Sequence, residues 1–236
     1  MRNRFWLICL MTVTTGIGLA RAEGQKSKSG GILTGHLKVT APYRKAPPPS
    51  LASGEKDEYG YGHKSYGTQT HTLPEQVVIY LKKVKGRFSP PTKHVPLDQK
   101  YLQFTHRVLP VLRGTTVDFT NHDPVYHNVF TNSQSNKFDL GRKRNGETVS
   151  VKMTKSEVPV KVYCEIHAAM KAYVLVLDNP FFTTVGPDQT FEIKGIPPGT
   201  YTMVAWHDFW APVEQKVRIK KGKTTQADVT MDKVQE

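Results

Sequence analysis

The stretch Cys164-Glu165-Ile166-His167-Ala168-Ala169-Met170 decides the fold of the middle of this chain. The apolar run 158–163 precedes it, and a second apolar run, 172–177, follows it. Both runs have the length and the β-branched composition of strands, so the seven residues between them predict a tight loop that joins two neighbouring strands of a sandwich.

Alternate residues of the first run share one face of their strand, because side chains point to opposite faces with a period of two. These residues are Val158, Val160, Val162 and Cys164. The valines predict that this face, and the thiol with it, points into the interior. A buried thiolate costs free energy unless a cation balances its charge, and a metal ion removes that cost.

The loop carries three soft or borderline metal donors, which are Cys164, His167 and Met170. A blue-copper electron-transfer centre uses two imidazoles, one thiolate and a weak axial thioether. The second imidazole is expected from His127, which follows a turn at 121–124. The neighbouring Asn128 is expected to tie the ligand-bearing segments together through its amide.

Two other interpretations of these residues stay open at this point. Zinc is a competing metal, although it prefers a harder fourth ligand or a water to a thioether. Alternatively, Cys164 is a small core residue, Met170 fills a gap and both histidines are incidental. The remaining histidines stand in no spacing that is typical of ligands; they include His36, His94, His106, His122 and His207.

Short apolar or alternating runs recur along the rest of the chain and predict an all-β fold. The expected strands cover 31–40, 76–81, 101–104, 107–112, 115–120, 126–131, 148–153, 158–164, 173–177, 190–194, 200–206, 213–220 and 224–231. Stretches with helical periodicity are missing from the sequence. Short strands at this spacing indicate a Greek-key sandwich.

The strands fall into two sets, which predicts two β-domains. The four strands of the last third would make only a thin sandwich alone, and the strands near 31–40 and 76–82 lack partners nearby. We expect one domain to comprise 31–85 plus 180–236, with a long loop at about 41–75, and a second domain at 86–179 to be inserted into it. The simpler alternative is two domains in tandem.

The first 22 residues predict a secretory signal peptide. A basic start and a short apolar core lead to Ala20-Arg21-Ala22, an A-x-A cleavage site. A membrane anchor is the alternative, but the apolar run is short and broken by Thr and Gly. Cleavage would leave Cys164 as the single cysteine of an exported, periplasmic protein without a transmembrane segment. Such a lone thiol in an oxidising compartment indicates a dedicated role such as metal ligation.

The chain is basic, with a formal net charge of +13. This charge favours acidic partner proteins or an anionic membrane face. Arg-rich stretches interleaved with aromatic residues are missing, so a nucleic-acid partner is not expected. The sequence does not specify the oligomeric state.

The motifs together resemble a known family. Phe119-Thr120-Asn121, His127-Asn128-Val129 and the Cys164, His167, Met170 spacing are similar to the cupredoxins, and the compact loop is most similar to amicyanin. The resemblance spans about 98–178. It implies His127, Cys164 and His167 as equatorial ligands of one type 1 copper ion and Met170 as the axial ligand. It also implies electron transfer through the edge of His167, within an apolar patch formed by Pro124, Val125, Ala168 and Ala169.

A second resemblance covers 31–39 and 190–231, which are similar to the carboxypeptidase regulatory-like (prealbumin-like) domain, mainly through Ile196-Pro197-Pro198-Gly199-Thr200. The whole chain is therefore expected to be a periplasmic blue copper protein that carries single electrons between redox partners, and not an enzyme. The alternatives are a copper storage or delivery protein, or a β-sandwich binding module with a vestigial copper site.

Overall fold

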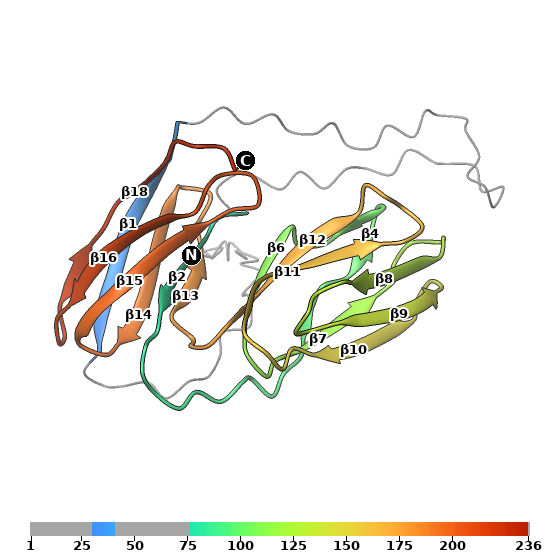
Figure 1. Ribbon diagram of the computed structural model, residues 1–236, viewed down its shortest axis with the longest axis horizontal. Coiled ribbons are helices and arrows are strands. Elements are labelled where there is room, and N and C mark those ends of the chain that lie inside the picture. Colours follow the sequence, from blue (N-terminus) through green and yellow to red (C-terminus); the bar gives the residue numbers. More distant parts are fainter. Residues whose placement is uncertain (1–29, 41–75, 236) are drawn as a thin grey trace, which may run out of the picture.

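The computed structural model describes residues 30–40 and 76–235 (Figure 1). The predicted signal peptide at 1–22 and the predicted loop at 41–75 lie outside the described residues. Eighteen β-strands and no α-helix are found in the described ranges, which confirms the all-β prediction. These ranges also hold no helix that is long and apolar enough to cross a membrane.

The middle of the chain folds into a sandwich of two sheets. Side chains alternate along its strands, so that in β7 the apolar Val117 and Phe119 point inward between half-buried polar residues. The first sheet has the order β6 (Val108–Leu112), β12 (Lys171–Leu177), β11 (Glu157–Cys164), β8 (His127–Thr131) and β9 (Phe138–Lys143). The second has the order β10 (Thr148–Lys152), β7 (Thr116–Thr120) and β3 (Val95–Pro96), and the short β4 (Gln99–Lys100) pairs with β5 (Gln103–Phe104).

Strand β11 lies between β12 and β8 in the first sheet, and this arrangement positions the predicted metal loop. Cys164 at the end of β11 is opposite Val129 of β8, and Tyr163 is opposite Phe130. The antiparallel pairing of β11 with β12 continues up to the loop, where Tyr163 is opposite Lys171. The loop therefore connects adjacent strands at one end of the sandwich, as the sequence predicts.

The two ends of the chain form a second pair of sheets. One sheet has the order β14 (Thr190–Ile196), β1 (Gly31–Val39) and β17 (Thr224–Gln226), with β18 (Val229–Met231) also paired to β1. The other has the order β13 (Phe182–Thr184), β2 (Val78–Lys82), β15 (Gly199–Trp206) and β16 (Val213–Ile219). Leu33, Ile79, Ile196 and Trp210 are among the fully buried side chains between them.

The two sandwiches meet across a third apolar cluster. Val78, Tyr80, Val204 and Trp206 of the second sandwich pack with Val108, Leu175 and Leu177 of the first. Beside this cluster, Arg107 donates through Nε to Asp208 at 3.0 Å and lies over the ring of Tyr173. The chain thus passes from β2 into the first sandwich and returns from β12 to β13 (Figure 1). The exact domain limits at 85/86 and 179/180 stay a prediction.

Some local predictions were wrong. The strand expected over 101–104 shrinks to β5, because Tyr101 and Leu102 have positive φ values of 59° and 56° and donate their N–H groups to Asp123. The single strand expected over 224–231 is split at 227–228, where Ala227 donates to the Thr34 carbonyl and Asp228 accepts from the His36 N–H group. The sequence analysis also missed β9 and β13.

Val158 does not face the core as predicted. Its side chain is 38% exposed, whereas Val160, Val162 and Cys164 are buried. The pairing of β11 with β12 shifts its register between Glu157 and Val160, so the alternation that holds from Val160 onward does not extend back to Val158.

Candidate metal centre

Three of the predicted ligands converge at one end of the first sandwich. The Cys164 sulfur lies 3.6 Å from Nδ1 of His127 and 3.7 Å from Nδ1 of His167, and the two Nδ1 atoms are 3.0 Å apart. His127 and Cys164 are buried, and His167 is half-buried. Within the described ranges, this is the one group of three or more His, Cys, Asp or Glu side chains arranged to hold a metal ion.

Backbone hydrogen bonds hold the loop in this arrangement. The Cys164 N–H group donates to the Met170 carbonyl at 3.2 Å, and the Met170 N–H group donates to the His167 carbonyl at 2.9 Å. The Glu165 N–H group donates to the Asn128 carbonyl of β8 at 2.9 Å. The loop is therefore tied both to itself and to the strand that carries His127.

A buried carboxylate orients His127. Its Nε2 lies 2.9 Å from Oδ2 of Asp123, whose side chain is 2% exposed. Since a carboxylate can only accept, Nε2 carries a proton, and the other ring nitrogen, Nδ1, is the one that faces Cys164 and His167. Asp123 is itself held by the N–H groups of Tyr101 at 2.6 Å and Leu102 at 2.9 Å.

The electrostatics of the site favour a thiolate. Burial raises the pKa of Cys164, but hydrogen bonds from His127, from His167 and from the backbone N–H groups of His167 and Asn128 outweigh it and lower the pKa to about 5. Burial lowers the pKa of His127, but Asp123 and Cys164 outweigh it, so the pKa is raised. For Asp123, burial raises the pKa, while the hydrogen bonds from His127, Leu102 and Tyr101 give a net lowering.

These distances fit a shared metal ion. Protein nitrogen and sulfur ligands lie about 2.0–2.3 Å from a metal such as zinc, so two of them on one ion are separated by about 3–4 Å. The three separations of 3.0, 3.6 and 3.7 Å fall in this range. A thiolate with the Nδ1 atoms of two imidazoles beside it is also the equatorial donor set of a blue-copper centre.

The other two predicted site residues lie beside this triad. Met170 is 2% exposed and belongs to the same core cluster as Cys164. Asn128 is buried, and its Nδ2 donates to Oε2 of Glu165 at 2.7 Å, which links β8 to the loop by a second contact.

The exposed surroundings of the triad differ in one respect from the expected apolar patch. Pro124, Ala168 and Ala169 are exposed, but Val125 is 7% exposed and packs in the core. The backbone there is held by the buried Asn121, whose Nδ2 donates to the Val125 carbonyl at 2.7 Å. Tyr126, which is 48% exposed, takes the place of Val125 on the surface.

Asp123 is the site residue that the sequence analysis missed. It was treated as part of a turn, although its position four residues before His127 was visible in the sequence. The contact depends on the chain at 101–102 folding over the turn, which no local pattern reveals. Of the histidines set aside, His94 and His122 pair with Asp118 and Asp98 outside the triad.

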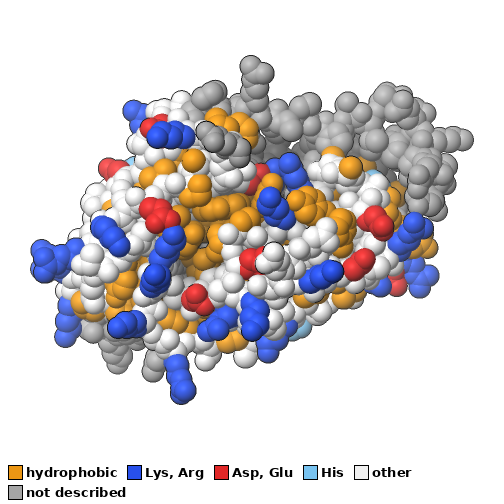
Figure 2. Space-filling model, in the orientation of Figure 1, with side chains coloured by type: hydrophobic (Ala, Val, Ile, Leu, Met, Phe, Trp, Pro, Cys, Tyr) orange, Lys and Arg blue, Asp and Glu red, His pale blue; other side chains and the backbone are white. Residues whose placement is uncertain are grey.

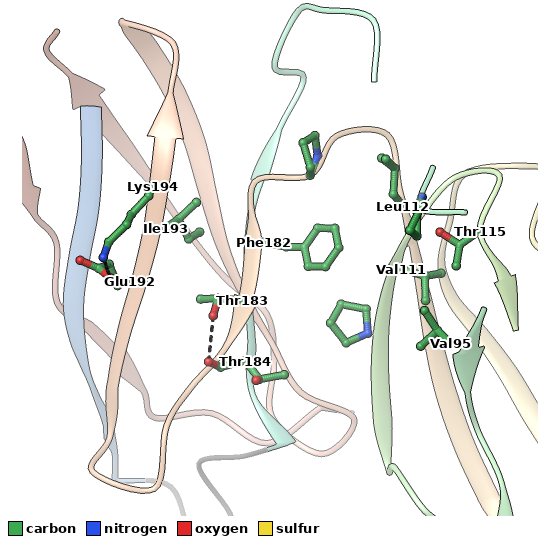
Figure 3. Close-up of a pocket in the computed structure, with 13 residues that line it drawn as sticks. Val95, Val111, Leu112, Thr115, Phe182, Thr183, Thr184, Glu192, Ile193 and Lys194 are labelled. Atoms are coloured by element: carbon green, nitrogen blue, oxygen red, sulfur yellow. Dashed lines mark hydrogen bonds and ion pairs between the residues drawn. The ribbon is translucent and has the colours of Figure 1, made fainter. Parts of the chain in front are cut away.

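A cavity elsewhere in the molecule contains none of these residues. It has a volume of about 250 Å³ and lies between β13 and β14 on one side and β6 on the other (Figure 3). Val95, Val111 and Phe182 contribute apolar walls, and Glu192 pairs with Lys194 at 2.7 Å on β14. The cavity is a feature of the seam between the sandwiches rather than part of the metal site.

Comparison with known families assigns the first sandwich. The sequence-family model for copper-binding proteins of the plastocyanin/azurin family matches residues 92–177. This range includes His127, Cys164, His167 and Met170. This segment is therefore a cupredoxin domain. A second model, described as domain II of polysaccharide lyase family 4, matches residues 171–227, so the end of the chain resembles a different kind of β-domain.

Solved structures give partial likenesses. A reduced Cu(I) mutant of amicyanin is 18% identical, with a TM-score of 0.34 over 42% of this chain and 97% of amicyanin. A purple cupredoxin from Nitrosopumilus maritimus is 27% identical, with a TM-score of 0.28 over 31% of this chain and 80% of its own. A Cu-containing nitrite reductase from Thermus scotoductus is 24% identical, with a TM-score of 0.36 over 40% of this chain, but the match spans a quarter (25%) of the reductase. No curated protein gave a match.

Proposed function

We propose that the chain is a type 1 copper protein that carries single electrons between redox partners. The observation that carries this proposal is the convergence of Cys164, His127 and His167 with separations of 3.0–3.7 Å in a domain of a copper-binding family. His127, Cys164 and His167 would hold one copper ion as equatorial ligands, and Met170 would be the axial ligand.

Bound copper supplies a reversible one-electron couple, and the residues of this chain prepare its site. Asp123 keeps the His127 lone pair directed at the site, and the N–H groups of Asn128 and His167 stabilise the thiolate. The apolar core around Cys164 and Met170 excludes water. Ligands that are fixed in advance move little when the charge of a centre changes, which favours fast electron transfer.

The half-buried His167 is the proposed route for electrons. It is the triad member nearest to solvent, and the exposed Ala168 and Ala169 follow it in the loop. A partner that docks over this apolar surface would approach the ring edge closely. We propose no catalytic activity, because the four ligands would leave no open position for a substrate.

The cellular setting is also a proposal. The basic start, apolar core and A-x-A site of residues 1–22 support export to the periplasm. The basic net charge, to which residues 1–22 contribute only three arginines, supports acidic redox partners. The strand pairing of β1 and β2 with β13 to β18 supports a single β-domain made of 31–85 and 180–236, with the cupredoxin domain between its two parts.

Visible spectroscopy of the copper-loaded protein tests the electron-carrier proposal. We expect an intense thiolate-to-copper band that is lost in Cys164→Ala and kept in the control His122→Ala, whose exposed ring pairs with Asp98 outside the site. A colourless Cu(I) complex that exchanges readily with chelators would support storage or delivery instead. Failure to bind copper would leave a binding module with a vestigial site.

A further inference from the structure

A second candidate site lies on the other sandwich. A groove of about 700 Å³ is lined by the end of β2, the turn before β15, and the adjacent parts of β15 and β16. Volumes of about 300–1,000 Å³ are typical of ligand sites. The lining residues include four lysines, which are Lys82, Lys83, Lys85 and Lys216, and a single acidic residue, Glu214.

Strand register explains why the lysines gather there. Thr202 of β15 is opposite Lys82 of β2 on one side and Lys216 of β16 on the other. Three adjacent strands span about 10 Å, so Lys82 and Lys216 stand on strands to either side of Thr202. One step further along the same face, Thr200 is opposite Arg218, which adds another exposed cation.

The other half of this sheet face is covered. In the other direction along β15 from Thr202, Val204 is opposite Tyr80 of β2. Both residues belong to the apolar cluster that packs against the cupredoxin domain. The part of the sheet face that carries Lys82, Lys216 and Arg218 therefore begins where the contact between the sandwiches ends. In Figure 2, Lys and Arg side chains outnumber the acidic groups that lie among them over the part of the molecule that holds β15 and β16 in Figure 1.

Two of the lysines are available to a ligand. Lys82 pairs with Glu214, and Nζ of Lys216 donates to Oγ1 of Thr202 at 2.8 Å. Lys83 and Lys85 are exposed and form no ion pair within the described part of the chain. Lys83 has a φ of 56°, an uncommon backbone conformation for a residue other than glycine. The next residue, Val84, is buried and anchors this segment to the core.

We propose that this groove binds a carboxylate-bearing polysaccharide. Its lining offers ammonium groups for carboxylates, and the hydroxyl groups of Thr200 and Thr202 for sugar hydroxyls. The hydroxyl of Tyr201 holds the turn at the groove's end by donating to the Pro197 carbonyl at 3.0 Å. An acidic peptide is less well suited, because the groove lies on a sheet face, where side chains rather than a free strand edge meet the ligand.

The groove shares no residue with the metal centre. Its lysines lie on β2 and β16 and the segment that follows β2, whereas the metal donors lie on β8 and in the loop after β11. A sugar chain bound there would anchor the protein to an acidic matrix while leaving His167 accessible. Binding of a polysaccharide in the groove therefore does not depend on copper.

Binding of the full-length protein to polygalacturonate tests the proposal, with neutral dextran as the uncharged comparison. We expect salt-dependent binding to polygalacturonate and none to dextran. The double variant Lys83→Glu/Lys85→Glu should weaken binding by about tenfold or more, because it removes two attractions and adds two repulsions. The neutral pair Lys83→Ala/Lys85→Ala should weaken it less.

The matched control is Lys152→Glu/Lys155→Glu, which makes the same change of net charge on exposed lysines of the cupredoxin domain. Its binding should stay close to that of the unaltered protein. The proposal is overturned by absence of binding to polygalacturonate, or by equal losses in the groove variant and the control. Equal affinity for poly-glutamate would assign the groove to acidic peptides instead. Circular dichroism of each variant checks that it is folded.

Discussion

The carboxylate of Asp123 lies 2.9 Å from Nε2 of His127, and both side chains are almost completely buried. The two residues are four positions apart in the sequence. Asp123 also accepts hydrogen bonds from the N–H groups of Tyr101 and Leu102, more than twenty residues earlier. The orientation of the first imidazole is thus determined by three segments. Because Nε2 donates to Asp123, Nδ1 is the nitrogen left to donate to the thiolate or, after losing its proton, to ligate a metal ion.

Replacing the carboxylate of Asp123 with an amide tests this role. In Asp123→Asn the shape is kept, but the acceptor charge that fixes the His127 tautomer is lost. We expect copper affinity to fall by about 10- to 100-fold, the usual effect of losing a partner of a ligating histidine. Competition with a chelator measures it. Asp98→Asn, which removes a carboxylate bonded to Thr120 and His122, is the control; equal losses in both variants would contradict the assignment.

The contact between Asn128 and Glu165 gives a second test. Asn128→Ala removes the 2.7 Å hydrogen bond that ties the loop to β8. Because the loop then has more freedom, we expect copper to dissociate about tenfold faster. Stopped-flow transfer to a chelator measures the rate. Asn136→Ala is a matched control, since this buried asparagine binds Glu157 at 3.0 Å away from the ligands; an unchanged rate in Asn128→Ala would show that the contact is dispensable.

The metal-free protein should titrate in an unusual way. The pKa of Cys164 is lowered to about 5, so ultraviolet thiolate absorbance should appear with a midpoint near that pH. Since the folded pKa lies below the unfolded value, the thiolate contributes stability that is full above about 9 and lost as the pH falls towards 5. The difference in free energy of unfolding between the unaltered protein and Cys164→Ala should therefore grow as the pH rises across this window.

His127→Ala provides the check on that explanation. It removes the largest of the interactions that lower the Cys164 pKa, so the midpoint of the thiolate titration should move upward. A midpoint of the unaltered metal-free protein close to 9 would contradict the proposed hydrogen-bonded thiolate.

The ion pair between the sandwiches should contribute measurably to stability. Arg107→Ala leaves the carboxylate of Asp208, whose side chain is 5% exposed, without its main cation. We expect the free energy of unfolding to fall by about 2–3 kcal/mol, as for other lost charge-assisted hydrogen bonds. Denaturant titration measures it. Arg113→Ala breaks a pair that is more than half exposed on both sides and should cost about 0–1 kcal/mol; equal costs would refute the distinction.

The apolar seam should make the two sandwiches unfold together. Leu175 is fully buried in the cluster that joins them, so Leu175→Ala should cost about 2–5 kcal/mol. The loss of the copper band and the loss of β-sheet circular dichroism should keep the same midpoint in this variant. Two separated transitions in the unaltered protein would show that the seam does not couple the sandwiches.

The sequence identified the candidate metal donors but not the residue that orients one of them. Cys164 and His167 are three residues apart and flanked by valine-rich strands, a pattern that local alternation exposes directly. His127 was found because a turn precedes it and a strand follows it. Asp123 could not be recognised, because its role depends on backbone groups at 101–102 whose positive φ values no sequence pattern indicated.

The same distinction holds for the fold. Strands with strict alternation, such as β7 and β14, were predicted within two residues. Strand β9 was missed because Gly141, Arg142 and Lys143 end the alternation that Phe138 and Leu140 begin. Val158 was misplaced because a register shift lies within an otherwise regular alternation, and only the partner strand reveals it.

The pairing of strand β1 determines which domain can fold first during synthesis. It pairs with β14, β17 and β18, so its partners leave the ribosome only after all the strands of the cupredoxin domain. The strands of the cupredoxin domain pair only with one another and are complete long before. The cupredoxin domain can therefore fold before residues 31–39 meet their partners. A chain cut after residue 180 would keep the strands of that domain but lose β14, β17 and β18, the partner strands of β1.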